Sequence, residues 1–290
     1  MKPIDIAWAV VVAIIWGVSF VLTRIALDEM SPTLMNTLRF AITALPCLVL
    51  PRPKLSLGLV VAASWLLVAQ FFAQTYGMAQ GVPPGLTAVI VQSQALFTVA
   101  LAALFLGEMP TRMQALGIMI AMCGLLLICF TVGYDFSVGA FAVAMIAPVA
   151  FAALNLLLRR AQKVSMVNLF PWMSLAAMIP LVPVLLVMED LGRTWHSLTH
   201  LSLGAVASIL ALALLGNMLG YWIWGRLLRD YSAAQVVPFA LLVPFFGAGA
   251  SSIVFNEHFG TLRLAGMIVV VLGIAVMLLS RRPPALVEAV

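Results

Sequence analysis

Charged side chains are scarce in this sequence. Lys, Arg, Asp and Glu together make up 9% of the 290 residues, whereas hydrophobic residues make up 64%, and the mean hydropathy is +1.16. A soluble core does not need so apolar a chain, but a polytopic helical membrane protein does. The apolar residues come in long runs rather than in alternation, which excludes a membrane β-barrel.

The groups that catalysis, metal binding and ion coupling use are missing from these runs. No Asp, Glu, His or Lys lies deep within any of them. An intramembrane carboxylate is the usual proton- or cation-coupling group, so this lack argues against a drug pump driven through a membrane-embedded Glu. It also argues against catalytic residues, a metal site or a cofactor in the membrane. No phosphate-binding glycine loop points to ATP, and Cys47, Cys123 and Cys129 fit neither a disulfide framework nor a zinc site.

Ten apolar runs are long enough to cross a membrane, which takes a helix of about 20 residues. We expect the spans at residues 4–26, 32–50, 57–78, 84–106, 112–131, 138–158, 166–187, 203–226, 233–255 and 262–280. The first run is longer than the hydrophobic region of a signal peptide and no cleavage site follows it, so we expect it to be retained. Ten spans leave room for short loops only.

The basic residues of the loops predict the orientation. With the N-terminus in the cytoplasm, eleven Lys and Arg residues lie on the cytoplasmic side and three on the other side, which is a clear positive-inside bias. The eleven are Lys2, Arg52, Lys54, Arg112, Arg159, Arg160, Lys163, Arg226, Arg229, Arg281 and Arg282, and the three are Arg24, Arg193 and Arg263. We therefore expect both termini in the cytoplasm. No basic run exceeds two residues, so we expect no nucleic-acid partner.

A spaced triplet occurs twice, at the start of the last span of each half. A Glu and two Gly stand at intervals of nine and seven, first as Glu108, Gly117 and Gly124 and then, 149 residues later, as Glu257, Gly266 and Gly273. Each half holds five spans, and five is odd, so the second half enters the membrane in the opposite sense. We therefore expect two inverted repeats, residues 1–131 and 138–280, followed by a short cytoplasmic tail, 281–290. Inverted repeats are typical of secondary transporters, whose substrate site lies near the midplane.

Neutral polar and aromatic residues within the spans are the candidate substrate-cavity residues. A buried amide that faced lipid would be costly, so these side chains are expected to face a cavity or another helix. The set is Trp16, Ser19, Gln70, Gln74, Tyr76, Gln92, Gln94, Asn155, Asn217 and Tyr221. Pro244 joins it because proline frees a backbone carbonyl that can face a cavity or act as a hinge. The alternatives are interhelical hydrogen bonding and interfacial aromatic belts, and we expect Trp222 and Trp224 in a belt.

Arg39 is the one charged residue well inside a span. Counted from Pro32, it lies about 10 Å below the outer surface at 1.5 Å per residue. It has two interpretations: a partner for a substrate carboxylate, or a structural arginine that snorkels or pairs with Asp28 or Glu29.

Several short motifs in this sequence resemble those of a known family. Trp16-Gly17, Arg39-Phe40 and Leu106-Gly107-Glu108, the last echoed by Phe255-Asn256-Glu257, are similar to the motifs of the EamA-type drug/metabolite transporters. Among these, the chain most resembles the YddG-type bacterial amino-acid exporters. The resemblance implies an all-α polytopic fold of ten transmembrane helices in the bacterial inner membrane. It also implies a basket-like central cavity lined by the first, third, fourth, sixth, eighth and ninth spans, with the fifth and tenth spans at the periphery. Glu108 and Glu257, which lie at helix ends, are expected to be structural caps or gate elements rather than substrate ligands.

These observations predict a secondary transporter rather than an enzyme. We expect it to export amino acids, including aromatic ones, or related small metabolites by alternating access. Because no buried carboxylate is available for ion coupling, we expect facilitative transport down the substrate gradient, with coupling through a peripheral group or Arg39 as the alternative. Its partners would be the small-molecule substrate and the lipid bilayer, and the sequence leaves the oligomeric state open, a monomer included. A nucleotide-sugar or drug carrier of the same fold is an alternative. A polytopic enzyme acting on lipid is another, and His196 and His200, near Glu189 and Asp190 in the loop at 188–202, are its only candidate residues.

Overall fold

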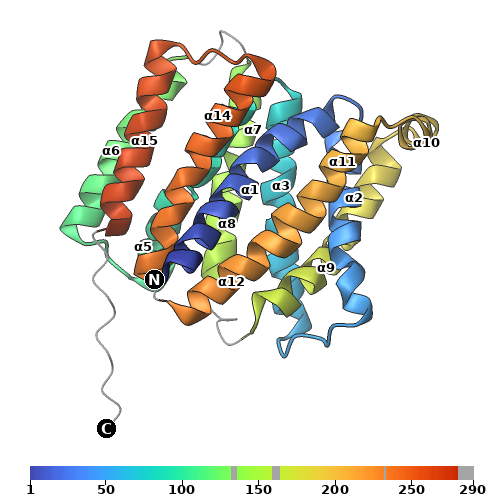
Figure 1. The fold of residues 1–290 in the computed structure, drawn as a ribbon, viewed down its shortest axis with the longest axis horizontal. Helices are drawn as coiled ribbons and strands as arrows, with labels where there is room; N and C mark the ends of the chain where they lie inside the picture. The colour runs from blue at the N-terminus through green and yellow to red at the C-terminus, as the bar shows by residue number, and fades with distance from the viewer. Residues whose placement is uncertain (132–135, 159–163, 232, 280–290) are drawn as a thin grey trace.

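The computed structural model describes residues 1–131, 136–158, 164–231 and 233–279, and within these ranges the ordered elements are all helices. The basic residues Arg159, Arg160, Lys163, Arg281 and Arg282 and the predicted tail lie outside the described residues. Figure 1 shows the helices as a bundle. Its first half contains α1 (Pro3–Leu27), α2 (Pro32–Ala44), η1 (Leu45–Leu48), α3 (Leu57–Ala79), α4 (Pro84–Gln92), α5 (Gln94–Leu106) and α6 (Arg112–Cys129). The second half contains α7 (Val138–Ala144), α8 (Ile146–Leu158), α9 (Met166–Met188), α10 (Leu191–Thr199), α11 (Leu203–Ala211), η3 (Leu212–Leu219), α12 (Gly220–Asp230), α13 (Ala233–Val236), η4 (Val237–Leu242), α14 (Val243–Phe255) and α15 (Thr261–Leu279).

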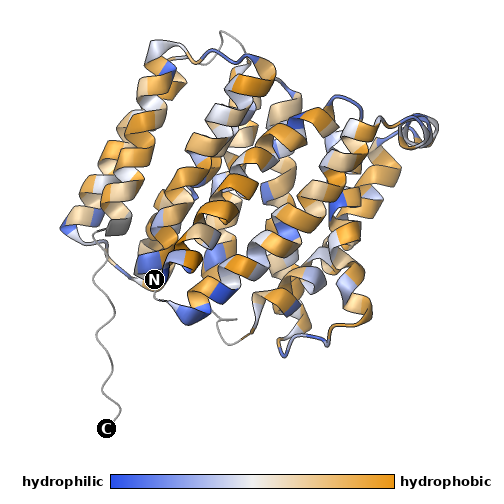
Figure 2. Cartoon of the chain, in the orientation of Figure 1, coloured by the Kyte–Doolittle hydropathy of each residue, from blue (hydrophilic) through white to orange (hydrophobic). Residues whose placement is uncertain are grey.

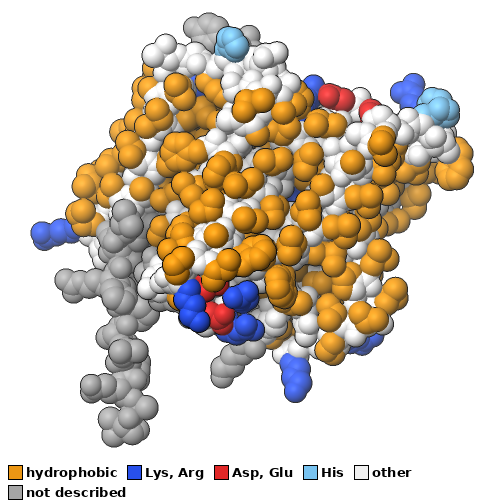
Figure 3. Space-filling model, viewed as in Figure 1, with side chains coloured by type: hydrophobic (Ala, Val, Ile, Leu, Met, Phe, Trp, Pro, Cys, Tyr) orange, Lys and Arg blue, Asp and Glu red, His pale blue; other side chains and the backbone are white. Residues whose placement is uncertain are grey.

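Eight helical stretches of the described chain are long and apolar enough to cross a membrane. They coincide with eight of the ten predicted spans. The other two predicted spans hold α2 with η1, and α15, whose apolar stretch Thr261–Met277 is shorter. Hydrophobic residues predominate along the helices (Figure 2). In Figure 3 hydrophobic side chains cover the visible face, and charged side chains gather at its two ends. Large apolar residues such as Leu104, Val187 and Ile253 are largely exposed, as expected for a surface whose solvent is lipid.

Four of the predicted spans contain an interruption of the regular α-helix. One break falls at Ser93, between α4 and α5, and another at Met145, between α7 and α8. Between α11 and α12 the chain forms the π-helix η3, and between α13 and α14 it forms the 3₁₀-helix η4. Pro148, Pro238 and Pro244 account for two of these breaks, because proline cannot donate the helical hydrogen bond. Such breaks are stable in a membrane only where other groups satisfy the freed backbone atoms.

The glycines of the repeated triplet bring α6 and α15 together. A Cβ atom added at Gly117 would lie 2.6 Å from the Gly273 carbonyl oxygen, and one added at Gly124 would lie 2.7 Å from that of Gly266. Residue numbers rise along α6 in the direction in which they fall along α15, so the two helices run antiparallel (side by side in Figure 1). Small residues permit this close approach of two backbones.

The segment at 188–202, which we expected to be a loop, contains the helix α10. Its start is explained by Asp190, whose carboxylate accepts a hydrogen bond of 2.9 Å from the Arg193 backbone N–H. An N-cap of this kind satisfies one of the free donors at a helix start. The hydropathy pattern hid this helix because it is short and mostly exposed.

The close crossing of α6 and α15 makes a stability prediction. Gly124→Ala would place a Cβ 2.5 Å from the Val270 backbone nitrogen, and relieving that clash requires a backbone shift, at a cost of about 1–3 kcal/mol. Gly249→Ala is the matched control, since its added Cβ would meet nothing within 4 Å beyond its chain neighbours and the nearby backbone of its own helix, and alanine is the better helix former by about 1 kcal/mol. Thermal melts of the purified variants should show a lower midpoint for Gly124→Ala only. Equal midpoints would contradict the tight crossing.

Candidate substrate cavity

A cavity of about 510 Å³ lies inside the bundle. Residues of α1, α2, α3, α4, α5, α8, α9, η3, α12, η4, α14 and α15 line it. Nine of the eleven candidate cavity residues are among them: Trp16, Ser19, Gln70, Gln74, Gln92, Gln94, Asn155, Asn217 and Tyr221. Arg39 also lines the cavity. The sequence pattern therefore selected side chains that converge on one space from both halves of the chain.

Two candidates lie elsewhere. Tyr76 is 39% exposed and stacks on Phe72, with 5.9 Å between the ring centroids. It lies two positions after Gln74, and residues i and i+2 point to nearly opposite sides of a helix. Pro244 is buried in the first turn of α14 but does not line the cavity. The helices that contribute also differ from the expected set, since α2, α9 and Ile274 of α15 add lining residues.

Arg39 is the only charged side chain among the described residues that line the cavity. It is 4% exposed. Its Nη2 donates a hydrogen bond of 2.7 Å to the Asn217 side-chain oxygen, and its guanidinium carbon lies 4.3 Å from the centroid of the Phe71 ring. The arrangement holds one positive charge against an aromatic face, with an amide as its polar partner.

The helix breaks supply backbone acceptors at the cavity. The Trp16 indole N–H donates 3.0 Å to the Gly216 carbonyl in η3, where the π-helical spacing changes the normal pairing. The Gln92 side-chain amide donates to the Ala240 carbonyl in η4. In a regular helix that carbonyl would accept from residue 244, which is Pro244 and has no N–H. Pro244 does not line the cavity, but it leaves the Ala240 carbonyl free to accept the hydrogen bond from Gln92.

A second polar group on the cavity wall joins the two halves. The Asn155 side-chain amide donates 2.7 Å to the Gln94 side-chain oxygen and lies 3.3 Å from the Thr98 hydroxyl. Asn155 is on α8, whereas Gln94 and Thr98 are on α5. Amide and hydroxyl groups of this kind can either hold neighbouring helices together or exchange those bonds for a ligand.

Aromatic rings form one wall of the cavity. The Trp16 ring lies 5.5 Å from Tyr221 and 5.2 Å from Trp224, centroid to centroid. Tyr221 stacks on Phe170 at 4.3 Å. Our expectation that Trp224 belongs to an interfacial belt is wrong, because it lines the cavity beside Trp16. Its place on the stripe Asn217, Tyr221, Trp224, spaced four and three apart, was the available signal. Phe170 had no comparable signal in the sequence.

The histidine pair that an enzyme would use lies away from this cavity. His196 and His200 are exposed on and beside α10, with ring centroids 4.1 Å apart. His200 Nδ1 lies 2.9 Å from the His196 backbone oxygen. In the part of the chain that the structure describes, no group of three His, Cys, Asp or Glu side chains is placed to hold a metal ion.

The two repeat glutamates follow helix ends of the same geometry. Glu108 comes after Gly107 (φ 68°) and Glu257 after Asn256 (φ 52°), both left-handed residues that end a helix. Glu257 accepts hydrogen bonds from the Ser251 hydroxyl and from the Gly85 backbone N–H at the start of α4. A carboxylate there complements the partial positive charge of a helix N-terminus. Burial nevertheless raises the pKa of Glu257, against the opposing effects of these hydrogen bonds and of Arg263 and Arg24.

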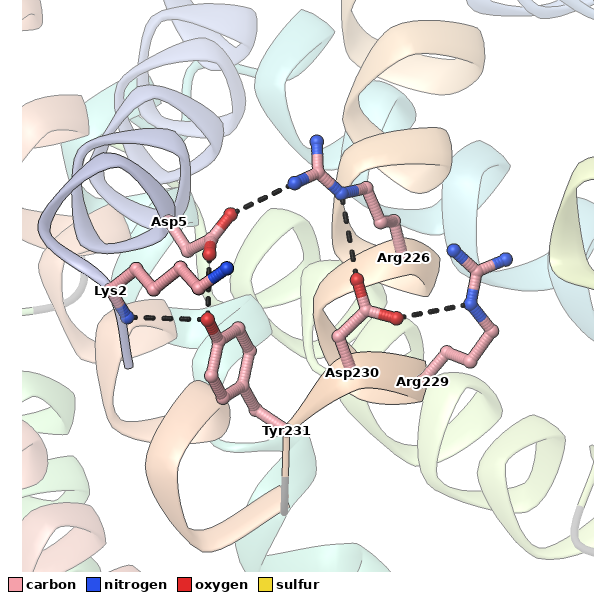
Figure 4. Close-up of polar contacts among 6 residues, drawn as sticks. All are labelled: Lys2, Asp5, Arg226, Arg229, Asp230 and Tyr231. Atoms are coloured by element: carbon pink, nitrogen blue, oxygen red, sulfur yellow. Dashed lines mark hydrogen bonds and ion pairs between the residues drawn. The ribbon is translucent and has the colours of Figure 1, made fainter.

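A charged network lies at the start of α1 (Figure 4). The Asp5 carboxylate is 4% exposed and accepts 3.0 Å from Arg226 and 2.6 Å from the Tyr231 hydroxyl. Arg226 also pairs with Asp230 at 3.6 Å. The Asp5 bond raises the pKa of the Tyr231 phenol, because an ionised phenol could no longer donate to the carboxylate. The network fastens the start of α1 to the end of α12.

Comparison with known proteins gives consistent matches along the chain. Residues 4–130 and residues 138–279 each match the model of the EamA-like transporter family. A probable amino-acid metabolite efflux pump of Salmonella typhimurium is 29% identical, with 92% of each chain covered, and its counterpart in Escherichia coli is 28% identical, with 94% covered. A probable terminal-alkyne amino-acid exporter of Streptantibioticus cattleyicolor is 27% identical over 97% of this chain and 95% of its own. A solved crystal structure with 14% identity covers 95% of this chain and 96% of its own at a TM-score of 0.66, which shows a shared fold.

The raised pKa of Glu257 predicts a pH-dependent stability. Since its pKa is higher in the folded protein than the ordinary 4.5, its contribution is fully present below about pH 4.5 and is lost as the pH rises through the folded value. Glu257→Gln keeps an oxygen acceptor but does not titrate. The difference in melting temperature between wild type and this variant should therefore shift in favour of the variant between about pH 4.5 and pH 7. Parallel melting curves across that range would contradict it.

The Asp5 network predicts unequal effects for two similar substitutions. Asp5→Asn removes a buried charge that two donors share, and should lower the free energy of unfolding by about 1–3 kcal/mol. Asp230→Asn is the matched control, because that side chain is 41% exposed and exposed pairs contribute only about 0–1 kcal/mol. Melts of both variants test the difference, and equal losses would show that Asp5 does not hold the helix ends together.

Proposed function

The chain belongs to the EamA-like transporter family, and we propose that it exports amino acids or related small metabolites through the central cavity by alternating access. The family and the efflux-pump relatives indicate a multi-pass membrane transporter and not an enzyme. The relatives whose names mention amino acids support the substrate class.

The observation that carries this proposal is the cavity itself. Ligand sites of drug-sized molecules occupy about 300–1,000 Å³ and combine apolar walls with a few polar groups. Here a cavity of about 510 Å³ is lined by one guanidinium, several amides and a wall of aromatic rings. One cation suits one carboxylate better than it suits the diphosphate of a nucleotide sugar. A positive cavity whose described lining holds no carboxylate also disfavours cationic drugs and proton or cation coupling, so the transport is facilitative.

The architecture proposed for this cycle has ten spans in two inverted halves, 1–131 and 138–280. Two separate family matches support the duplication, and the antiparallel crossing of α6 and α15 through equivalent glycines supports the inversion. The positive-inside bias supports cytoplasmic termini in a bacterial inner membrane. The two halves would rock about the cavity, which is the usual motion of inverted-repeat carriers. The substrate and the bilayer are the partners of this cycle.

Counterflow in proteoliposomes tests the function. Vesicles that hold purified protein and are preloaded with unlabelled phenylalanine, threonine or a nucleotide sugar should take up the matching labelled compound. We expect saturable amino-acid exchange that is unchanged by an imposed pH gradient, because no described titratable carboxylate faces the cavity. Vesicles without protein are the control. A pH-driven flux would contradict facilitative transport, and exchange of the nucleotide sugar alone would replace the proposed substrate class.

A further inference from the structure

The charge of Arg39 has no counter-charge within the described protein. Two acidic residues near the start of α2 were the sequence candidates for pairing with it, and both have other partners. Asp28 pairs with Arg24 at 3.1 Å, and Glu29 accepts hydrogen bonds from the backbone and hydroxyl of Ser202. No described carboxylate lines the cavity. The alternative in which Arg39 forms a structural ion pair is therefore not what the structure contains.

The guanidinium is held in one orientation by a closed set of contacts. Arg39 donates to Asn217, the Asn217 amide donates 3.2 Å to the Thr43 hydroxyl, and that hydroxyl donates 2.8 Å to the Arg39 carbonyl. The Phe71 ring supports one face of the guanidinium. These contacts are all to neutral groups. They fix the direction of the side chain and leave its charge unmatched.

Much of the hydrogen-bonding capacity of Arg39 is unused. A guanidinium carries five N–H donors, and Asn217 is the protein acceptor found for it. Its Nε, which is buried, has no hydrogen-bond partner. A buried, unpaired charge is costly in a membrane protein and marks a functional site more often than a structural one. A carboxylate in the cavity would supply both the missing charge and the missing acceptors, in the paired geometry that guanidinium favours.

We propose that Arg39 binds the carboxylate of the transported molecule, an inference that rests on the transport function proposed above. A second buried group fits the same ligand class. Gln70 precedes Phe71, lines the cavity and has a buried side-chain oxygen without a partner, which suits the ammonium of an α-amino acid. The wall of Trp16, Tyr221 and Phe170 suits an apolar or aromatic side chain. The cavity thus selects small monocarboxylates and rejects amines that lack the acid.

The test compares phenylalanine with its primary amide, which lacks the carboxylate, in counterflow and in thermal-shift titrations of the full-length protein. We expect wild type to bind the acid at least about tenfold more tightly than the amide. Arg39→Met should bring that ratio close to one, because both compounds then meet a neutral cavity. The ligand-free variant is melted as a check of folding, because the substitution leaves the buried Asn217 side-chain oxygen without its Arg39 donor. Arg193→Met, which removes an exposed arginine of α10, is the control and should keep the wild-type ratio.

Each result decides the assignment. An unchanged ratio in Arg39→Met, or a wild type that does not distinguish acid from amide, would overturn the role of Arg39 while leaving transport intact. Loss of all amino-acid flux in wild type would overturn the transport function and this inference with it. If Arg39→Met does not fold, Arg39→Lys keeps the charge but not the paired donors. If the preference for the acid over the amide falls about tenfold in Arg39→Lys, the assignment of Arg39 is supported. An undiminished preference rejects it.

Discussion

Inside a bilayer, every backbone N–H and C=O must find its partner within the protein, and this requirement shapes the whole bundle. Long helices satisfy that rule alone, which is why the chain is almost wholly helical. Where a helix is broken, the freed group needs a side chain or a cavity beside it. The two best-defined breaks meet that need, since Trp16 donates to Gly216 in η3 and Gln92 donates to Ala240 in η4. Both bonds cross from the first half of the chain to the second, so the irregular backbone that opens the cavity also joins its walls.

The same constraint explains how charge is distributed. The charged side chains visible in Figure 3 gather at the two ends of the bundle, and only Arg39 brings a formal charge to the described cavity wall. Its neighbours Asn217, Thr43 and Phe71 are neutral. They position the guanidinium without neutralising it. The described cavity wall therefore carries one positive charge that no described side chain neutralises.

Much of this could be predicted from the sequence, and the failures have physical reasons. Hydropathy located the helical stretches because burial in lipid acts on runs of about 20 residues. The cost of placing an amide against lipid identified Gln70, Gln74, Asn155 and Asn217 as inward-facing. Tyr76 lies outside the cavity because it follows Gln74 by two positions, and residues i and i+2 of a helix point to nearly opposite sides. The π-helix at Leu212–Leu219, the helix α10 and the part played by Phe170 depend on hydrogen-bond register and tertiary packing, which hydropathy does not encode.

The alternating access proposed for this protein would place a further demand on the two ends of α1. Asp5 and Arg24 lie 19 residues apart on this helix, about 29 Å at 1.5 Å per residue. At one end Asp5 holds α12 through Arg226, and at the other Arg24 lies close enough to Glu257 to affect its pKa, while Glu257 caps α4. Each cluster joins the two halves of the chain. In the proposed cycle, one of these clusters would loosen while the other holds. In both clusters the arginine is partly exposed, 39% for Arg226 and 36% for Arg24, so water can take its place beside the carboxylate when a cluster opens.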